Sequence, residues 1–168
     1  MSNYPHNNQK GFTLLEVLLV LAAVAVLASI VIFAINPGRQ LAQMRDAKRR
    51  ADVNLILNAV YQYSIDNNGN FPSDSIAQHS ETDCPLLKQN EICVTNPPNN
   101  LCGVDLEALY YEQRYLVSIP VDPHGAAFPS DFGGPGFGSG YNIIRNQNNR
   151  LTVCAPNTEL GSVISSTR

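Results

Sequence analysis

The sequence predicts an α+β fold in which one long N-terminal helix leads into a small antiparallel β-sheet. Three observations support this fold class. Residues 12–35 form an almost unbroken apolar run, residues 39–66 repeat apolar side chains at helical spacing, and residues 140–154 hold two strand-like segments joined by turn-forming residues. We therefore expect the second half of the long helix, after a kink near Pro37, to pack on the sheet.

The apolar run is long enough to cross a membrane. Of its 24 positions only Thr13, Glu16 and Ser29 are polar. As a helix the run would measure roughly 36 Å, compared with about 30 Å for the hydrocarbon core of a bilayer. A core helix of a soluble domain would show a polar face, and this run shows none beyond its first turn. A plain signal anchor or an uncleaved secretory signal is the alternative, but no Ala-x-Ala site follows directly.

Glu16 distinguishes the run from an ordinary membrane anchor. A carboxylate at the bilayer centre costs about 2.5–3.5 kcal/mol, so an acidic residue inside a span indicates function and requires a partner. Lys10 and Gly11 lie just before the run, and the small Gly11 suits a protease that must thread the backbone through its site. Cleavage after Gly11 would give Phe12 a new α-amino group one turn from Glu16, and this group supplies the missing positive charge.

The heptapeptide Lys10–Glu16 resembles the class III signal of type IV pilins and type II secretion pseudopilins. The shared features are a basic residue, Gly, Phe, Thr, two Leu and Glu ahead of an unbroken apolar helix. The resemblance implies a pilin-like fold, and a prepilin peptidase that cleaves between Gly11 and Phe12 on the cytoplasmic side and methylates the Phe12 amine. It also implies that Glu16 contacts the N-terminus of a neighbouring subunit.

These features divide the 168 residues into four segments. Residues 1–11 are the prepilin leader, 12–35 the transmembrane and assembly helix, 36–66 its amphipathic continuation, and 67–168 a globular α+β head. The head has an ordinary size for a single core. The net charge of −3 gives no general argument for binding nucleic acid.

Asn36-Pro37-Gly38 interrupts the helical pattern, because Pro37 lacks a backbone donor and disfavours the α region at Asn36. Either the helix kinks and continues, or it stops and restarts with Asn36 as N-cap and Pro37 in the first position. The pilin resemblance favours one long kinked helix. Beyond the kink, we expect the sheet-covering face to contain Leu41, Met44, Ala47, Ala51, Leu55, Ala59 and Gln62, widened by Val53, Ile56, Leu57, Val60 and Tyr61.

A basic cluster occupies this second half of the helix at Arg45, Lys48, Arg49 and Arg50. Its functional interpretations are contact with lipid headgroups, pairing with another subunit, and DNA capture, whereas the structural one is a solvated helix face. A solvated face or subunit pairing is favoured over DNA. The positive-inside rule, applied to this cluster alone, would place the head in the cytoplasm. The cysteines and the cleavage signal both argue for the opposite side, and we give them more weight.

The four cysteines, Cys84, Cys93, Cys102 and Cys154, all follow the apolar run. An even number in an exported domain predicts two disulfides in an oxidising compartment. The sequence does not choose among the three connectivities, and our preference is Cys84–Cys93 with Cys102–Cys154. A zinc site is disfavoured because no pair has Cys-x-x-Cys spacing and the three histidines are scattered.

The segment Ile119–Gly125 is similar to the Pro-x-Asp-Pro-x-Gly turn of major pseudopilins, with His124 in place of the aromatic residue. Asp122 and Pro123 favour a turn that ends at Gly125. A metal role for Asp122 together with His124 is the alternative to a turn.

Residues 126–140 are rich in glycine, and we expect an irregular excursion between strands. They do not form a phosphate loop, because no Lys-Ser/Thr pair follows. Major pseudopilins place a calcium loop in their C-terminal part. Asp131 is the only carboxylate between Gly125 and Cys154, which argues against calcium, and we predict no cofactor.

The remaining elements of the head are short. Residues 73–101 read as a loop-rich region and residues 105–115 as a short helix. Residues 140–144 and 150–154 form an antiparallel hairpin through the turn-prone residues 145–149. The C-terminal residues are expected to fray, apart from an edge strand near 160–164.

We predict a structural subunit of a type IV pilus-like or type II secretion pseudopilus filament. Its implied partners are copies of itself and related pilins, the prepilin peptidase/methylase, an inner-membrane assembly platform and the lipid bilayer. The expected location is a single membrane pass with an extracytoplasmic head, and a periplasmic or extracellular filament after assembly. The alternative is a monomeric membrane-anchored extracytoplasmic binding protein. An enzyme is disfavoured because Gly-x-Ser-x-Gly and His-Glu-x-x-His are absent.

Overall fold

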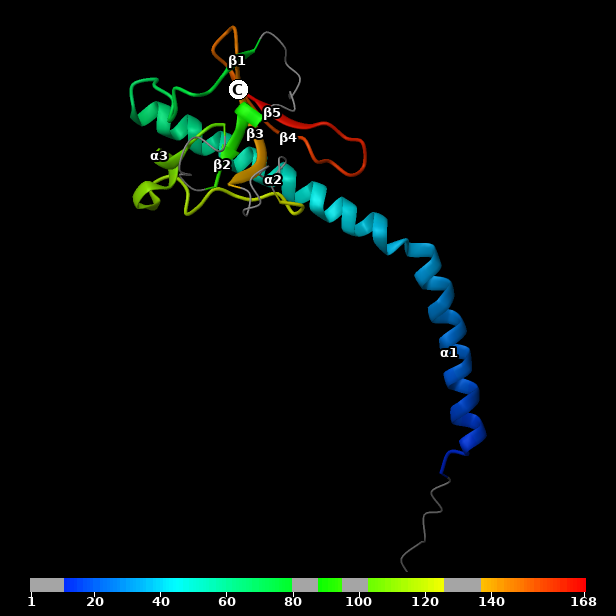
Figure 1. The fold of residues 1–168 in the computed structure, drawn as a ribbon. Coiled ribbons are helices and arrows are strands. Elements are labelled where there is room, and N and C mark those ends of the chain that lie inside the picture. Colours follow the sequence, from blue (N-terminus) through cyan, green and yellow to red (C-terminus); the bar gives the residue numbers. More distant parts are fainter. Residues whose placement is uncertain (1–10, 80–87, 95–102, 126–136) are drawn as a thin grey trace, which may run out of the picture. The chain divides into compact units, whose positions relative to one another are not determined.

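The computed structural model describes residues 11–79, 88–94, 103–125 and 137–168 (Figure 1). The chain divides into two compact units, residues 1–41 and 42–168. The first unit holds helix α1, Leu14–Ile35, and the start of helix α2, Pro37–Asp66. The second unit holds the rest of α2 and the β-sheet, and each unit is described by itself.

Helix α1 begins at Leu14 because Thr13 caps it. The Thr13 hydroxyl accepts a hydrogen bond from the backbone N–H of Glu16 at 3.2 Å. None of its 22 residues is buried. With a mean hydropathy of 3.1 in its most apolar window, α1 is long and apolar enough to cross a membrane.

Asn36 breaks the helical backbone between α1 and α2. Its φ of 45° and ψ of 76° lie in the left-handed region, which asparagine tolerates better than most residues. The Asn36 Oδ1 accepts a hydrogen bond from the Arg39 N–H at 3.3 Å, and Pro37 occupies the first position of α2, where no intrahelical donor is needed. The predicted kink near Pro37 is confirmed, in the form of a stop and restart at one residue.

The face of α2 that covers the sheet differs from the predicted series. Leu41, Met44 and Leu55 are exposed. So are Ala47, Ala51 and Gln62, so the prediction was wrong for most of the regular series. The buried face combines apolar and charged side chains and consists of Ala42, Asp46, Arg49, Asp52, Val53, Ile56, Leu57, Ala59, Val60 and Ser64.

The sheet is mixed and mostly antiparallel, with strand order β1-β3-β4-β5 and with β2 also paired to β3. Only β1 is parallel to its neighbour β3. The predicted hairpin is confirmed as β3–β4, in which Ile143 lies opposite Val153. The strands are β1, Gln78–His79; β2, Glu91–Cys93; β3, Gly138–Asn146; β4, Leu151–Ala155; and β5, Ile164–Thr167.

Three of these strands depart from the sequence expectation. β1 and β2 lie in the region predicted as loops. The sequence pattern did not reveal them because each strand is only two or three residues long and depends on pairing with β3. The C-terminal edge strand begins at Ile164, where the predicted one ends. The C-terminus is held rather than frayed, since the Arg168 backbone exchanges hydrogen bonds with Leu151 at 2.9 and 3.0 Å.

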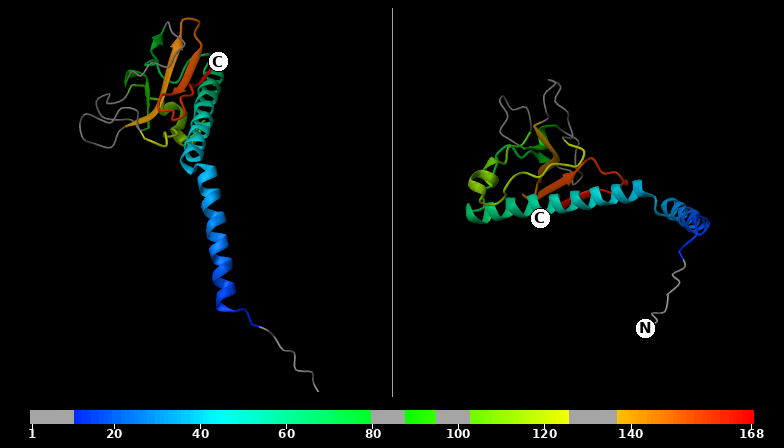
Figure 2. Two further views of the ribbon diagram at one scale, coloured as in Figure 1. Left: turned by 90° about the vertical axis from the view of Figure 1, so that its right-hand side faces the viewer. Right: turned by 90° about the horizontal axis from the view of Figure 1, so that it is seen from below.

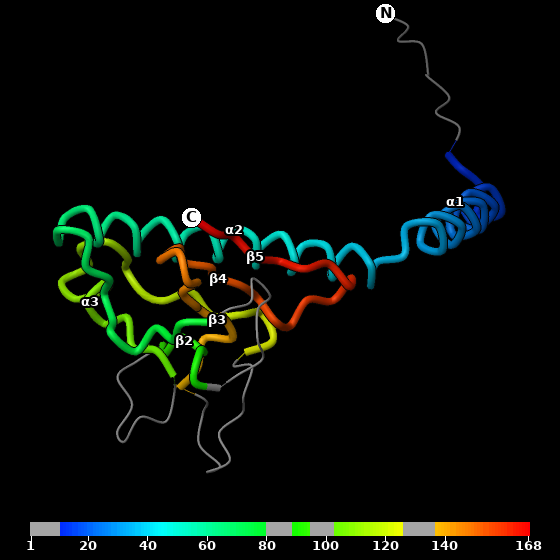
Figure 3. The backbone as a smooth tube through the Cα atoms, turned by 90° about the horizontal axis from the view of Figure 1, so that it is seen from above, coloured from blue at the N-terminus to red at the C-terminus, as the bar shows by residue number. Residues whose placement is uncertain are grey.

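Helix α2 lies along one face of the sheet, as Figures 2 and 3 show from different sides, and the buried core residues come from both elements. The predicted helix over 105–115 is reduced to α3, Glu107–Tyr110, followed by a 3-10 turn η2, Tyr111–Gln113; another 3-10 turn, η1, spans Lys88–Asn90. The helix stops because Tyr111 leaves the helical region, with φ of −58° and ψ of 125°, and Glu112 and Gln113 then adopt positive φ angles. The buried apolar residues include Val53, Ile56, Leu57, Val60, Leu106, Leu109, Tyr141, Ile143, Leu151, Val153 and Ile164.

Candidate functional site

The backbone from Gly11 to Thr13 lies outside helix α1. It has neither helical nor strand structure, and Thr13 is extended, with φ of −78° and ψ of 149°. The Phe12 side chain is 82% exposed. Exposed, extended chain next to a regular element is where proteolysis concentrates. The predicted cleavage position is therefore accessible in the first unit.

Glu16 lies in the first turn of α1 and faces a shallow hollow of about 310 Å³ lined by Phe12, Val17, Val20 and Leu21. The hollow is almost entirely apolar. Within the described chain, no side chain or backbone donor satisfies the Glu16 carboxylate. A carboxylate near a helix N-terminus gains about 0.3–1 kcal/mol from the helix dipole, which is less than the cost of an acid inside a bilayer. Within the described residues, nothing else offsets the cost of placing this carboxylate in a bilayer.

Comparison with known proteins shows what this N-terminal segment and the whole chain are similar to. Residues 6–35 match the family model described as "Prokaryotic N-terminal methylation motif". The type II secretion system core protein G of Escherichia coli (strain K12) is 29% identical over 119 residues, which cover 71% of this chain and 69% of that protein. The core protein G of Aeromonas hydrophila is 27% identical over 129 residues, or 74% and 77% of the two chains. No solved structure matches the chain.

The chain is a homologue of type II secretion pseudopilins. It carries the prepilin methylation motif, so the predicted resemblance is confirmed. The homology also makes it a structural protein rather than an enzyme. The apolar helix behind the motif is consistent with anchoring of the pseudopilin in the inner membrane.

The second unit of the chain contains a charge network in the first half of α2. Arg49 is fully buried. Its Nε and Nη2 donate to the two oxygens of Asp122 at 2.6 and 3.1 Å, and its Nη1 donates to Asp46 at 2.7 Å. The hydrogen bonds to Asp122 raise the pKa of Arg49 above its ordinary value. The prediction of a solvated helix face is therefore wrong for Arg49, although Lys48 and Arg50 are exposed.

Asp122 belongs to the turn that the sequence singled out. The Gly125 N–H donates to the Asp122 carbonyl at 2.8 Å, and Gly125 has a φ of 87°, which favours glycine. The His124 N–H donates to the Asp122 carboxylate at 2.8 Å. Both Asp122 oxygens are thus engaged, chiefly by Arg49, and the described residues contain no group of three side chains suited to a metal. The turn interpretation describes this segment.

Glu159 also contacts several side chains of the network. It accepts hydrogen bonds from Arg45 at 2.6 and 2.5 Å and from Arg49 at 3.1 Å, and its Oε1 lies 3.0 Å from the His124 Nε2. The hydrogen bonds from Arg45, followed by those from Arg49 and His124, hold the pKa of Glu159 below its ordinary value. Glu159 thereby ties the segment between β4 and β5 to α2.

A second polar contact crosses the core nearby. The Tyr141 hydroxyl of β3 donates to the Asp52 carboxylate of α2 at 2.7 Å. Burial, followed by this hydrogen bond, raises the pKa of Tyr141. The sequence analysis missed Tyr141, Asp52 and Glu159. The sequence held one usable signal for the buried face of α2 on which this network lies, because Asp46, Arg49, Val53 and Ile56 follow helical steps of three and four.

Only two of the four cysteines in the disulfide prediction lie within the described residues. Cys93 of β2 and Cys154 of β4 are buried, and both are disulfide-bonded. Cys84 and Cys102 lie outside the described residues, as does Asp131 of the glycine-rich segment. The pairing Cys84–Cys93 with Cys102–Cys154 stays a prediction.

Proposed function

We propose that the pseudopilin homologue is made as a prepilin, cleaved between Gly11 and Phe12, N-methylated on Phe12, and built into a secretion pseudopilus or a related filament. The observation that carries the proposal is the unpartnered Glu16 carboxylate on an otherwise apolar helix, next to an exposed cleavage position. The α-amino group of mature Phe12 on a neighbouring copy would supply the positive charge that pairs with the Glu16 carboxylate. Leaving either charge unpaired in apolar surroundings would penalise any other register of the helices.

The segments take distinct roles in this proposal. Residues 1–11 are the leader, 12–35 span the inner membrane and later pack in the filament, 36–66 continue the helix, and 67–168 form the rest of an extracytoplasmic head. The disulfide bonds at Cys93 and Cys154 support an oxidising compartment for the head. The partners are copies of the chain and related pilins, the prepilin peptidase/methylase and an inner-membrane assembly platform.

Intact-mass spectrometry of protein purified from membranes tests the processing steps. We expect the mass of residues 12–168 plus one methyl group. Gly11→Leu is expected to keep the full-length mass, because a bulky side chain would block the peptidase. A Cβ at Gly11 meets no atom within 4 Å and Gly11 lies outside helix α1, so the substitution is not expected to disturb the fold. A native protein that keeps its leader would refute the proposal and favour a monomeric membrane-anchored binding protein.

A further inference from the structure

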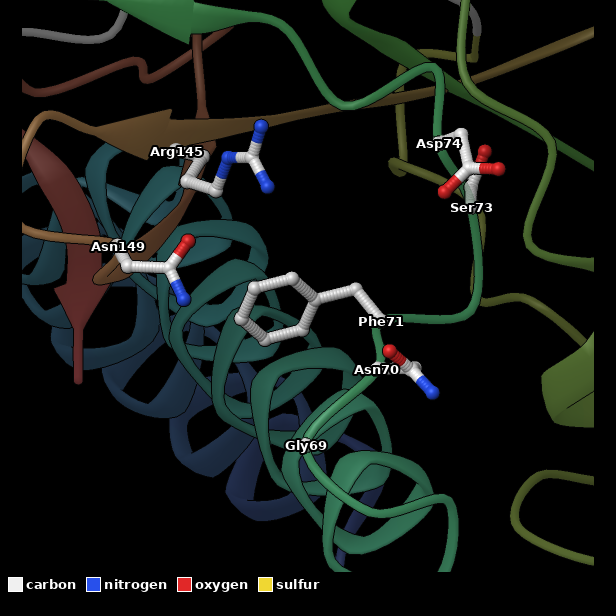
Figure 4. Close-up of a pocket in the computed structure, with 7 residues that line it drawn as sticks. All are labelled: Gly69, Asn70, Phe71, Ser73, Asp74, Arg145 and Asn149. Atoms are coloured by element: carbon white, nitrogen blue, oxygen red, sulfur yellow. The ribbon is translucent and has the colours of Figure 1, made fainter.

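A polar pocket lies in the second unit, where the loop after α2 meets the end of the β3–β4 hairpin (Figure 4). Its volume is about 620 Å³, which suits a small molecule. It lies outside the charge network and the apolar helix. Its lining consists of Gly69, Asn70, Phe71, Ser73, Asp74, Arg145 and Asn149.

Both walls of the pocket are fixed by backbone hydrogen bonds. The Gly69 N–H donates to the Ser64 carbonyl at 2.8 Å and closes the end of α2. On the opposite wall, the Arg145 N–H donates to the Ala77 carbonyl at 3.0 Å. The Asn146 side chain accepts from the Asn148 and Arg150 N–H groups at 3.0 and 2.8 Å and shapes the hairpin turn. The pocket is therefore largely formed before any ligand arrives.

Arg145 is the unusual member of the lining. Within the described residues its Nε is buried and has no hydrogen-bond partner, so the outer Nη1 and Nη2 groups are the donors that a ligand can reach. In the described part of the chain, Arg145 also forms no ion pair, unlike Arg45 and Arg49. A buried unsatisfied donor costs about 1–3 kcal/mol, and more when the group is charged. A planar guanidinium is built to bind a carboxylate through two parallel hydrogen bonds.

The remaining lining residues define what else a ligand must carry. Figure 4 shows the Phe71 ring turned towards the hairpin, below Arg145 and beside the Asn149 carboxamide. Phe71 is partly buried against the core, which holds its ring in place. An aromatic face fits an apolar or ring-shaped group. Asn149 and Ser73 offer hydrogen bonds to hydroxyl or amine groups.

We propose that this pocket binds the carboxylate of a small ligand, with Arg145 as the anion-binding residue and Phe71 as the surface on which the ligand's apolar face lies. Asp74 lines the other side of the pocket and places a negative charge near the ligand. A zwitterion such as a free α-amino acid meets both charges, whereas an acidic sugar shares only the carboxylate chemistry. The proposal concerns the head alone and does not rest on filament assembly.

Saturation-transfer NMR with the full chain in detergent micelles tests the proposal. The probes are L-leucine and galacturonate, with L-leucinamide and galactose as matched ligands that lack a carboxylate. We expect transfer to at least one carboxylate probe and not to its matched control. Binding of leucine identifies an amino acid as the ligand class, and binding of galacturonate alone identifies an acidic sugar.

Variants at two arginines of the same hairpin separate recognition from general charge. Arg145→Gln is expected to raise the dissociation constant of the bound probe at least about tenfold, and Arg145→Lys by less. The exposed neighbour Arg150→Gln should leave the constant unchanged. The proposal is overturned if neither carboxylate binds, if the controls bind equally well, or if Arg145→Gln and Arg150→Gln behave alike.

Discussion

Arg49 determines how the charge network contributes to the stability of the head. Replacing it with leucine would leave Asp122 and Asp46 buried without their cationic partner, and breaking a buried pair in this way costs about 3–5 kcal/mol. We expect Arg49→Leu to lower the free energy of unfolding by that amount. Arg50→Leu, at the exposed next position, should change it by no more than about 0.5 kcal/mol.

Denaturant unfolding of the full chain in detergent measures this difference. Equal transition midpoints for the two variants would show that the buried ion pairs do not contribute to stability. The comparison is informative because both variants remove one arginine from the same turn of α2.

Glu159 makes the stability of the head depend on pH. Its pKa is lowered from the ordinary 4.5 by the arginines and His124, so folding favours its ionised form. A carboxylate with a depressed pKa contributes stability above its ordinary pKa, and this contribution is lost as the pH falls towards the folded-state value. We therefore expect wild type to exceed Glu159→Gln in thermal midpoint at neutral pH, and the gap to narrow below about pH 4.5. A gap that stays constant down to about pH 3 would argue against the ion pairs at Glu159.

Among the elements, the turn at Asp122 is held against strand β3. The Asp122 N–H donates to the Ser139 carbonyl at 2.8 Å. At the next position, Gly140 has a φ of 83°, and a Cβ there would lie 2.5 Å from both the Asp122 Cβ and the Gly125 carbonyl oxygen. Only glycine permits this approach, which in turn places Asp122 beside Arg49 on α2.

Gly140→Ala should therefore destabilise the head by more than the strain of a positive φ, which is about 1–2 kcal/mol. Gly69→Ala is the matched variant, because Gly69 also has a positive φ but a Cβ there meets nothing within 4 Å. The difference between the losses in free energy of unfolding of the two variants measures the cost of the clash alone. Similar losses would mean that the turn moves away from β3 without cost.

At the scale of the whole molecule, the proposed function depends on whether Glu16 directs the assembly of the filament. Glu16→Ala should insert into membranes at the wild-type level, because it removes a charge from the span, but it should yield few or no filaments. Ser29→Ala is the control in the same helix, since the Ser29 hydroxyl already donates to the Ala25 carbonyl at 2.8 Å and needs no neighbour.

Shearing and electron microscopy of cells expressing each variant report the filament yield, and membrane fractionation reports insertion. Filaments from Glu16→Ala at wild-type yield would remove the basis of the proposed assembly contact. Loss of insertion in the same variant would point to a role of Glu16 in the anchor itself.

Residues 12–35 needed no tertiary information to be recognised, because uniform apolarity specifies a helix exposed to lipid or to other helices whatever the head does. The break near Pro37 and the β3–β4 hairpin were also predictable, since proline geometry and turn-forming residues act locally. The same holds for the prepilin motif, which is a contiguous run of residues.

The tertiary structure alone decided which face of α2 is buried. The sequence offers an apolar series through Leu41, Met44 and Leu55 and a second series that includes Asp46 and Arg49, and pattern alone favours the less charged one. The charged face of α2 is the buried one because Asp122 and Glu159, more than 70 positions away, form hydrogen bonds with Arg49 inside the head. The pocket around Arg145 likewise joins residues 69–74 to residues 145–149, and no local pattern reports such a meeting. Contacts between distant segments are set by the packing of the whole head, and so they appear only in the folded chain.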